Sequence, residues 1–373
     1  MRRSWRFSGG GTPRGQGWLR GLALALLMVG PMLAATNSVA AQDDIVVTMV
    51  TDTAGLGDQN FNDLAFRGGT QAAEDFGVTF EALESETPAD YVRNLTQAAE
   101  QSTLTVAVGF LLAEALAEVA PQYPDKQFLF IDGVVEGDNI ASVTFKEHQS
   151  SFLTGIIAGL TTKTGIVGYL GGQRIPPVIR YEVGWVSGIR SVNPNADIRI
   201  VYADTFNDPA LGNEITLTMY NQGADIVQAA AGRTGVGSFD AAKAKGPGNW
   251  VVAADTDQSQ LGAEYQLCVA QKGVDTAVYL VSQQVVEGNF QGGVQDLGLA
   301  EQGVDLTNVA ASVSPDTVAV ADAYKQAIID GQITVPATDD ELAAFQPTTP
   351  EQLGLSATPA ATPVGSPAAS PAA

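Results

Sequence analysis

The chain is nearly devoid of the residues used for thiol, metal or imidazole chemistry. Its 373 residues include one cysteine, Cys268, and one histidine, His148. A single cysteine excludes an internal disulfide. One cysteine and one histidine together are too few for a metal site built on thiolate or imidazole ligands. No nucleophile-elbow motif and no phosphate-cradling glycine loop occurs either. The sequence therefore predicts no metal site, no cofactor and no catalytic residues.

Basic residues are also scarce, with 19 Lys and Arg against 41 Asp and Glu. Removing the five arginines that lie within residues 1–41 changes the formal net charge from −22 to −27. Such a surface repels nucleic acid and anionic lipid, which excludes nucleic acid as a partner. Without disulfides, an exported chain needs a large core, and about 300 residues with 45% hydrophobic composition supply one most naturally as two lobes.

Long apolar runs are absent except near the N-terminus. Arginines precede the apolar segment Leu19–Ala35, and Val39-Ala40-Ala41 fits a small-residue cleavage site. Gly30 and Pro31 interrupt the segment, which favours a cleaved signal peptide over a permanent span. We therefore expect residues 1–41 to be a signal peptide and the mature protein to be exported, periplasmic or at the cell surface.

The C-terminal end has a different composition from the rest of the chain. Residues 356–373 contain Ala, Pro, Ser, Thr and other uncharged residues, with no charged side chain. This composition predicts a disordered tail, which we place at residues 346–373.

Between these ends, short β-branched apolar segments alternate with amphipathic ones. Strand-like segments run from Ile45–Val50 to Gln266–Ala270, and helix-like stretches such as Tyr91–Glu100 lie between them. One βαβαβ series covers Ile45–Phe145, and a second of similar length covers Ile166–Ala254. The alternation predicts an α/β protein with two doubly wound parallel sheets, one in each lobe.

Polar and aromatic residues follow the first predicted strand. The segment Gly55–Asp63 contains Asp58, Asn62 and Phe61, and Phe66 lies within the next turn. Open α/β sheets hold their ligands at the carboxyl ends of their strands. Amide and carboxylate groups beside flat apolar rings suit a planar, polar, uncharged ligand such as a nucleoside or a sugar. An ordinary βα turn capped by Asp and Asn explains the same segment when it is taken alone.

Three later strand ends carry a comparable set. Phe206 follows one strand, the turn Gly232–Gly237 follows the next, and Asp255 ends a third. Glycine at position 232 would let the backbone approach a ligand closely. If the two lobes close toward each other, these residues face the Asp58–Asp63 turn.

Taken together, these motifs resemble the basic membrane protein family of transporter substrate-binding proteins, whose best-understood members bind purine nucleosides. The resemblance runs from about Asp44 to Pro336. The matching segments are Gly57–Asp63, Gly109-Phe110, Phe128–Asp132, Ser151–Gly155, Lys163–Gly168, Tyr220–Asp225 and Asp255–Gln258. Their order and spacing make the match specific.

The resemblance implies a type I periplasmic-binding-protein fold, in which two lobes are joined by a three-strand hinge. We expect the chain to cross near Ser142–Phe145, Val269–Lys272 and Gly293–Gly298. The first lobe would then contain residues 42–145 and about 272–295, and the second residues 146–271 and about 296–340.

The resemblance also implies roles for individual residues. Two aromatic rings, Phe66 and Phe206 by position, would sandwich a purine base. The other assignments give Asp58, Asn62 and Asp132 hydrogen bonds to the base, and Gly232, Asp255 and Lys272 hydrogen bonds to the ribose hydroxyls.

Two departures from the family pattern matter. Arg233 stands where the glycine turn commonly has a second glycine, so a guanidinium beside the ribose site could alter specificity. The family commonly carries a lipid-modified cysteine after the signal peptide, but no cysteine lies near Ala41. We therefore do not expect lipid anchoring.

The function that follows is an extracytoplasmic solute-binding protein. It would be a monomer that captures a nucleoside, purine nucleosides first, and delivers it to the membrane permease of an ATP-driven importer. A sugar or another small polar solute is the alternative ligand, and a sensory receptor of the same fold is the alternative class. An enzyme such as a nucleoside hydrolase is disfavoured, because the chain lacks the N-terminal aspartate cluster expected for that chemistry.

Overall fold

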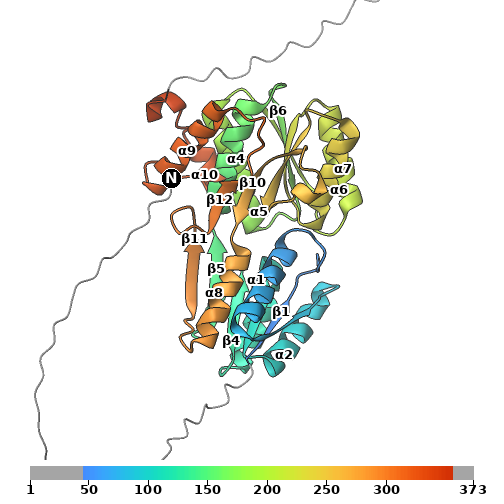
Figure 1. Cartoon of the computed structure of the whole chain (residues 1–373), viewed down its shortest axis with the longest axis vertical. Coiled ribbons are helices and arrows are strands. Elements are labelled where there is room, and N and C mark those ends of the chain that lie inside the picture. The colour runs from blue at the N-terminus through green and yellow to red at the C-terminus, as the bar shows by residue number, and fades with distance from the viewer. Residues whose placement is uncertain (1–44, 356–373) are drawn as a thin grey trace, which may run out of the picture. The chain divides into compact units, whose positions relative to one another are not determined.

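The computed structural model describes residues 45–355, which form two lobes, each built on a six-stranded sheet (Figure 1). The predicted signal peptide and the tail from residue 356 onward lie outside the described residues. Within residues 45–355, no helix combines the length and apolar character needed to cross a bilayer.

The first lobe contains a sheet with strand order β11-β5-β4-β3-β1-β2, in which every neighbouring pair is parallel. Helix α8 packs against α1 so closely that a Cβ at Gly68 would lie 2.3 Å from the carbonyl oxygen of Asp275. The elements are β1 (Val46–Val50), α1 (Phe61–Phe76), β2 (Thr79–Leu83), α2 (Tyr91–Gln101), β3 (Leu104–Val108), α3 (Ala113–Val119), β4 (Gln127–Ile131), β5 (Ile140–Phe145), α8 (Val274–Val286) and β11 (Gly293–Leu297).

The second lobe contains a sheet with strand order β12-β10-β9-β8-β6-β7, in which only β12 runs antiparallel to its neighbour. Its elements are α4 (Glu147–Thr161), β6 (Ile166–Gly171), α5 (Pro176–Val192), β7 (Asp197–Tyr202), α6 (Pro209–Asn221), β8 (Ile226–Ala230), α7 (Arg233–Lys245), β9 (Trp250–Asp255), β10 (Gln266–Lys272), β12 (Val304–Thr307), α9 (Pro315–Ile329) and α10 (Asp339–Ala344).

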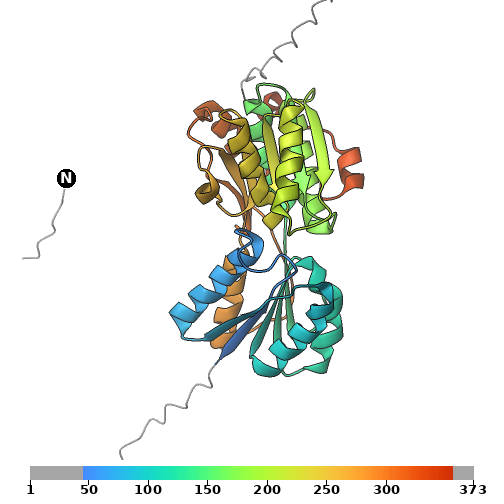
Figure 2. The same ribbon diagram turned by 90° about the vertical axis from the view of Figure 1, so that its right-hand side faces the viewer.

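Three chain segments connect the lobes, and Figure 2 shows them running between the two sheets. The chain passes from β5 to α4 around Lys146, from β10 to α8 around Gly273, and from β11 to β12 between Leu297 and Val304. The predicted fold class, with two doubly wound lobes and a three-strand hinge, is confirmed. The carboxyl ends of β1, β3 and β4 in one lobe and of β8 and β9 in the other deliver their loops to the space between the lobes.

Fully buried strands explain why the sheets form. The central strand β3 is buried along its whole length, as is β8, and both consist mainly of Val, Ile, Leu and Ala. Such continuous apolar strands need helices on both faces of the sheet. Among the edge strands, β11 is exposed along most of its length, which is why an apolar pattern marks it poorly.

The predicted disorder is wrong for residues 346–355. Pro350–Leu353 form a short 3₁₀ helix, and Pro350 is buried. The Tyr324 hydroxyl on α9 donates a hydrogen bond of 2.6 Å to the carbonyl oxygen of Thr348. The side chains of Leu353 and Leu355 pack against the core of the second lobe. Apolar residues in this segment therefore bind it to α9, although its composition is polar and proline-rich.

Candidate functional site

A cavity lies between the lobes. Both lobes line it. The first lobe contributes the loop after β1 and the ends of β3 and β4, and the second contributes α5 and the ends of β7, β8 and β9. Seven of the eight residues predicted from the sequence line the cavity: Asp58, Asn62, Asp132, Phe206, Gly232, Asp255 and Lys272.

The structure does not bring Phe66 to the cavity. Its half-buried ring packs on Phe80, with the ring centroids 5.2 Å apart, on the face of α1 turned away from the cavity. Phe61 lines the cavity instead. The two residues are five positions apart on one helix, which places their side chains about 140° apart around its axis. Only one of them can therefore face the ligand, and it is the first residue of α1.

Asp58 builds the loop that precedes α1. It is fully buried, and its two carboxylate oxygens accept hydrogen bonds from the backbone N–H groups of Asn60 (2.9 Å), Asn62 (2.8 Å) and Asp63 (3.1 Å). These are the N–H groups that a helix start leaves unpaired. Burial raises the pKa of Asp58 to about 6, against the opposing effect of these backbone donors. The main role of the Asp58 carboxylate is therefore to cap the start of α1. Its place in the cavity wall is a consequence of this role.

Asn62 presents a free acceptor in this part of the wall. Its amide nitrogen donates to Asp52 Oδ1 at 2.9 Å and to Asp58 Oδ2 at 3.2 Å. This orientation leaves Asn62 Oδ1 buried without a partner among the described residues. Asp52 also lines the cavity, and burial raises its pKa. Asp52 was missed from the sequence, although a polar residue at the end of β1 was a signal for it.

Two further carboxylates stand at strand ends in opposite lobes. Asp132 follows β4 with φ of 73°, and Asp255 ends β9 with φ of 64°. Asp tolerates this left-handed backbone region better than most residues, but a positive φ still marks a position that the surrounding structure imposes. Asp132 Oδ1 is buried with no partner within residues 45–355, whereas Asp255 Oδ1 accepts a hydrogen bond of 2.8 Å from the Tyr181 hydroxyl.

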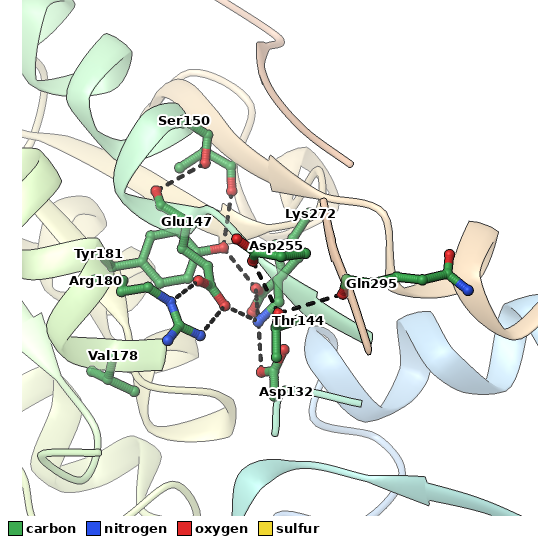
Figure 3. A network of polar contacts seen from close by, with 12 residues as sticks. Asp132, Thr144, Glu147, Ser150, Val178, Arg180, Tyr181, Asp255, Lys272 and Gln295 are labelled. Atoms are coloured by element: carbon green, nitrogen blue, oxygen red, sulfur yellow. Dashed lines mark hydrogen bonds and ion pairs between the residues drawn. The ribbon is translucent and has the colours of Figure 1, made fainter. Parts of the chain in front are cut away.

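Lys272 lies at the centre of the charged residues of the cavity (Figure 3). Its ammonium nitrogen is 2.6 Å from Asp132 Oδ2, 3.0 Å from Glu147 Oε1 and 4.0 Å from Asp255 Oδ1. The side chain is only 2% exposed. Burial alone would lower the pKa of Lys272, but the neighbouring carboxylates raise it above its ordinary value, so the ammonium stays charged. Burial raises the pKa of Asp132 to about 6 even though Lys272 lowers it.

Glu147 supports Lys272 from behind the cavity wall. It is fully buried at the first turn of α4, and the Arg180 guanidinium of α5 forms an ion pair with it. Burial acts to raise the pKa of Glu147, but Arg180 and Lys272 hold it below its usual value. The residues around Lys272 therefore form one network that draws on both lobes and on two of the connecting segments.

Phe206 and the glycine turn form the wall contributed by the second lobe. The Phe206 ring packs directly on Gly172, where a Cβ would lie only 2.2 Å from the ring. The ring can occupy this position because residue 172 has no side chain. Gly232 has φ of 53° and a Cβ there would lie 3.4 Å from the Phe206 carbonyl oxygen. Arg233 is exposed and is not part of the cavity lining.

Direct hydrogen bonds also join the rims of the lobes. Gln258 Nε2 of the second lobe donates to the carbonyl oxygen of Gln59 at 3.1 Å, and Asn207 Nδ2 donates to the carbonyl oxygen of Thr53 at 3.3 Å. Gln258 is 3% exposed, so its contact is shielded from solvent. Phe110, which belongs to the matching motif Gly109-Phe110 but was given no role, and Tyr181, which the sequence did not reveal, also line the cavity. No group of three or more His, Cys, Asp and Glu residues that could hold a metal occurs within residues 45–355.

Two sheet lobes that enclose a polar, aromatic-lined cavity beside a three-segment hinge define a substrate-binding protein. A family model described as "ABC transporter substrate-binding protein PnrA-like" matches residues 45–339, and the chain belongs to this Bmp family. The family consists of extracytoplasmic solute-binding proteins, not enzymes, and implies a small-molecule ligand and a membrane permease as partners.

Similar proteins agree with this assignment. The chain is 36% identical to the "CD4+ T-cell-stimulating antigen" of Listeria monocytogenes, over 85% of this chain and 98% of that protein. It is 33% identical to the "ABC transporter nucleoside-binding protein BmpA" of Lactococcus lactis, over 81% and 92% of the two chains. A solved solute-binding protein of an ABC transporter system from Aeropyrum pernix is 30% identical, with a TM-score of 0.74 and coverage of 80% and 96%.

The names of some relatives bear on membrane attachment. Three relatives from Pyrococcus species, 31–33% identical to this chain, are named uncharacterized lipoproteins. Their names run against the expectation that lipid anchoring is absent. The single cysteine of this chain, Cys268, is fully buried in β10.

Proposed function

We propose that this substrate-binding protein captures a nucleoside, and purine nucleosides in particular, for an ATP-driven importer. The observation that carries the proposal is the composition of the cavity wall. Phe61 of the first lobe and Phe206 of the second line the same cavity, together with buried acceptors that have no partner in the part of the chain that the structure describes. Flat apolar surfaces suit the faces of a base, and unpaired acceptors suit its N–H groups and the hydroxyls of a sugar.

The charges of the cavity favour a neutral ligand rich in hydrogen-bond donors. Four aspartates line the cavity, namely Asp52, Asp58, Asp132 and Asp255, and Lys272 is the one cation of the described lining. A phosphorylated ligand would place its negative charges beside these carboxylates, whereas an unphosphorylated nucleoside supplies only N–H and O–H donors. The proposal therefore includes nucleosides and excludes nucleotides.

The expected placement follows from the positions of these groups. The base lies between Phe61 and Phe206, with Asp52 and Asn62 as acceptors for its donors. The sugar hydroxyls lie toward Asp132, Asp255 and Lys272. This arrangement replaces Phe66 with Phe61, gives Asp58 a supporting role and moves Asp132 from the base to the sugar. Asn62, Phe206, Asp255 and Lys272 keep the roles predicted from the sequence.

Closure of the lobes is the proposed mechanism of capture. A ligand that touches both lobes stabilises the closed arrangement over the open one, because only the closed arrangement makes both sets of contacts. The rim contact of Gln258 with Gln59 would add to the same state. The closed form is then the one that the permease distinguishes, and we propose that the protein acts as a monomer.

A ligand screen by thermal unfolding tests this proposal. The protein is stripped of bound ligand by unfolding and refolding, and then mixed with purine nucleosides, pyrimidine nucleosides, nucleotides, free bases, ribose and hexoses. A ligand that binds only the folded state raises the melting temperature. We expect a shift with guanosine, adenosine or inosine and none with ribose. A shift with a hexose and none with any nucleoside would replace the proposed ligand with a sugar.

A further inference from the structure

Lys272 is held in a defined orientation by groups that differ in their access to the cavity. Asp132 and Asp255 line the cavity, but Glu147, which is fully buried, is not part of the lining. Glu147 Oε1 is nevertheless 3.0 Å from the ammonium nitrogen, close enough for a charged hydrogen bond, whereas Asp255 at 4.0 Å is too far. Glu147 therefore contacts the cation of the site without access to the ligand.

The contact with Glu147 limits the orientation of the Lys272 ammonium, because that group has few hydrogen-bond donors. An ammonium group has three N–H donors and no acceptor. Asp132 accepts one of them at 2.6 Å, and the charge of Glu147, 3.0 Å from the nitrogen in an ion pair, attracts a second. The two carboxylates therefore restrict the directions that the third N–H can take. Aromatic rings restrict the ammonium further, since the ring centroids of Phe61 and Phe145 are 5.0 Å and 5.3 Å away.

Arg180 fixes Glu147 in turn. Its guanidinium donates from Nε to Glu147 Oε2 and from Nη2 to Oε1, the latter at 3.4 Å (Figure 3). Arg180 is part of α5, and its side chain is 19% exposed. Because both carboxylate oxygens are engaged, Glu147 cannot turn away from Lys272 without breaking an ion pair in a dry environment, which is costly.

The pair also connects two of the segments that pass between the lobes. Lys272 is the last residue of β10, directly before the chain enters α8. Glu147 is the first residue of α4, two positions after β5 ends at Phe145. The Lys272 ammonium, which belongs to the β10–α8 connection, therefore contacts Glu147 of the β5–α4 connection and Asp132 of the first lobe at the same time.

We infer that Glu147, held by Arg180, is a positioning residue that directs the third N–H of Lys272 into the cavity. The identity of the ligand group that receives this N–H, a sugar hydroxyl, rests on the proposed function. The positioning itself does not. Removal of Glu147 frees the ammonium to rotate toward Asp255, so that the donor is no longer directed at the ligand.

The variants must separate positioning from folding. Glu147→Gln alone leaves the Arg180 charge without its main partner, so the double variant Glu147→Gln/Arg180→Met removes both members of the pair. Lys272 keeps Asp132 and Asp255 in this variant. Asp305→Asn is the control, since it also removes one carboxylate of an ion pair, with Lys325, in a part of the second lobe outside the cavity.

Binding of two ligands with the same base is then compared, a ribonucleoside and its 2′,3′-dideoxy analogue. The double variant is expected to weaken ribonucleoside binding about tenfold, the size expected for a charged hydrogen bond of about 1.4 kcal/mol, and dideoxynucleoside binding less than about twofold. The control variant should change neither. Equal weakening of both ligands in the double variant would mean that the pair only maintains the fold, which overturns the inference.

A second measurement needs no ligand. In protein labelled with ¹⁵N-lysine, a Lys272 ammonium held by two carboxylates exchanges its protons slowly, and its contacts with the Phe61 and Phe145 rings identify its signal. We expect this signal to broaden through solvent exchange in the double variant and to persist in Asp305→Asn. An unchanged signal overturns the inference. If the wild-type protein binds no nucleoside, the proposed function fails, and this experiment alone decides the role of Glu147.

Discussion

Replacement of Phe61 by alanine should weaken nucleoside binding, and the same change at Phe66 should not. The two phenylalanines lie on α1 and are both half-buried, but only Phe61 lines the cavity, whereas Phe66 packs on Phe80. Stacking of a base on an aromatic side chain contributes about 1–3 kcal/mol. Loss of the Phe61 ring should therefore raise the dissociation constant about 5- to 150-fold.

The Phe61 ring also neighbours Lys272, 5.0 Å from its centroid, and such a cation–π contact is worth about 0.5–1 kcal/mol or more when desolvated. This contribution places the expected loss in the upper part of the range. Phe66→Ala should change the dissociation constant less than about twofold while it destabilises the fold, because its ring is lost from a packed contact.

Calorimetric titration of both variants with the same purine nucleoside measures the effect, and urea unfolding measures their stabilities. The stability measurement is needed because both substitutions remove a large side chain from α1. A loss of affinity in Phe66→Ala that equals or exceeds the loss in Phe61→Ala would refute the argument from helix geometry and would return the stacking role to Phe66.

Three other predictions concern the cavity wall, the rim and the helix packing. Burial raises the pKa of Asp132 to about 6. A ligand hydroxyl that donates to Asp132 Oδ1, which has no partner among the described residues, favours the ionised carboxylate, so ligand affinity should rise between pH 5 and pH 7. Asp132→Asn should flatten this pH dependence. The stability of the ligand-free protein should change with pH in the opposite direction. The raised pKa of Asp132 contributes to the free energy of unfolding below about pH 4, and this contribution is lost as the pH rises through about 6. Gln258→Ala removes the 3.1 Å bond to Gln59 across the rim, worth about 1 kcal/mol, and should speed ligand dissociation about fivefold in stopped-flow measurements; an unchanged rate would show that the rim contact does not hold the closed form. Gly188→Ala should lower stability by about 1–3 kcal/mol in urea unfolding, because its Cβ would lie 2.1 Å from the Phe152 carbonyl oxygen where α5 crosses α4; an unaltered midpoint would contradict this close packing.

The alternation of strands and helices was enough to predict the fold class, because buried parallel strands are apolar along their whole length. The predicted strand Ile45–Val50 begins one residue before β1, and Gln266–Ala270 ends two residues before β10 does. The apolar pattern did not identify the edge strands β11 and β12, since β11 reads Gly-Val-Gln-Asp-Leu and is exposed; only the family resemblance placed a hinge crossing near Gly293–Gly298. An edge strand needs little apolar character, so its sequence resembles that of a loop.

The candidate site was predictable where a strand end fixes the position of a residue. Asp132, Asp255 and Phe206 follow strands whose carboxyl ends face the other lobe, and all three line the cavity. Phe66 failed because a resemblance in motif order does not determine the rotation of a helix about its axis. That rotation depends on where the helix begins, and Asp58 determines the start through its three backbone hydrogen bonds.

The partners of Lys272 could not be inferred from the sequence in the same way. Glu147 and Arg180 are 125 and 92 positions away from Lys272 along the chain, and nothing in their local pattern distinguishes them from exposed charged residues. Tyr181 is similar, since its hydroxyl meets Asp255 only after α5 has packed against the second sheet. Such contacts depend on tertiary packing, which local sequence patterns do not encode.

The central claim is that the cavity between the lobes binds a nucleoside, and equilibrium titration calorimetry tests it most directly. Ligand-stripped protein is titrated with guanosine, adenosine and inosine, and with ribose and glucose as controls. We expect one saturable site per chain for at least one purine nucleoside, with a dissociation constant between about 1 nM and about 1 μM, and no binding of ribose. Absence of binding for every nucleoside, together with saturable binding of a sugar, would contradict the proposed function.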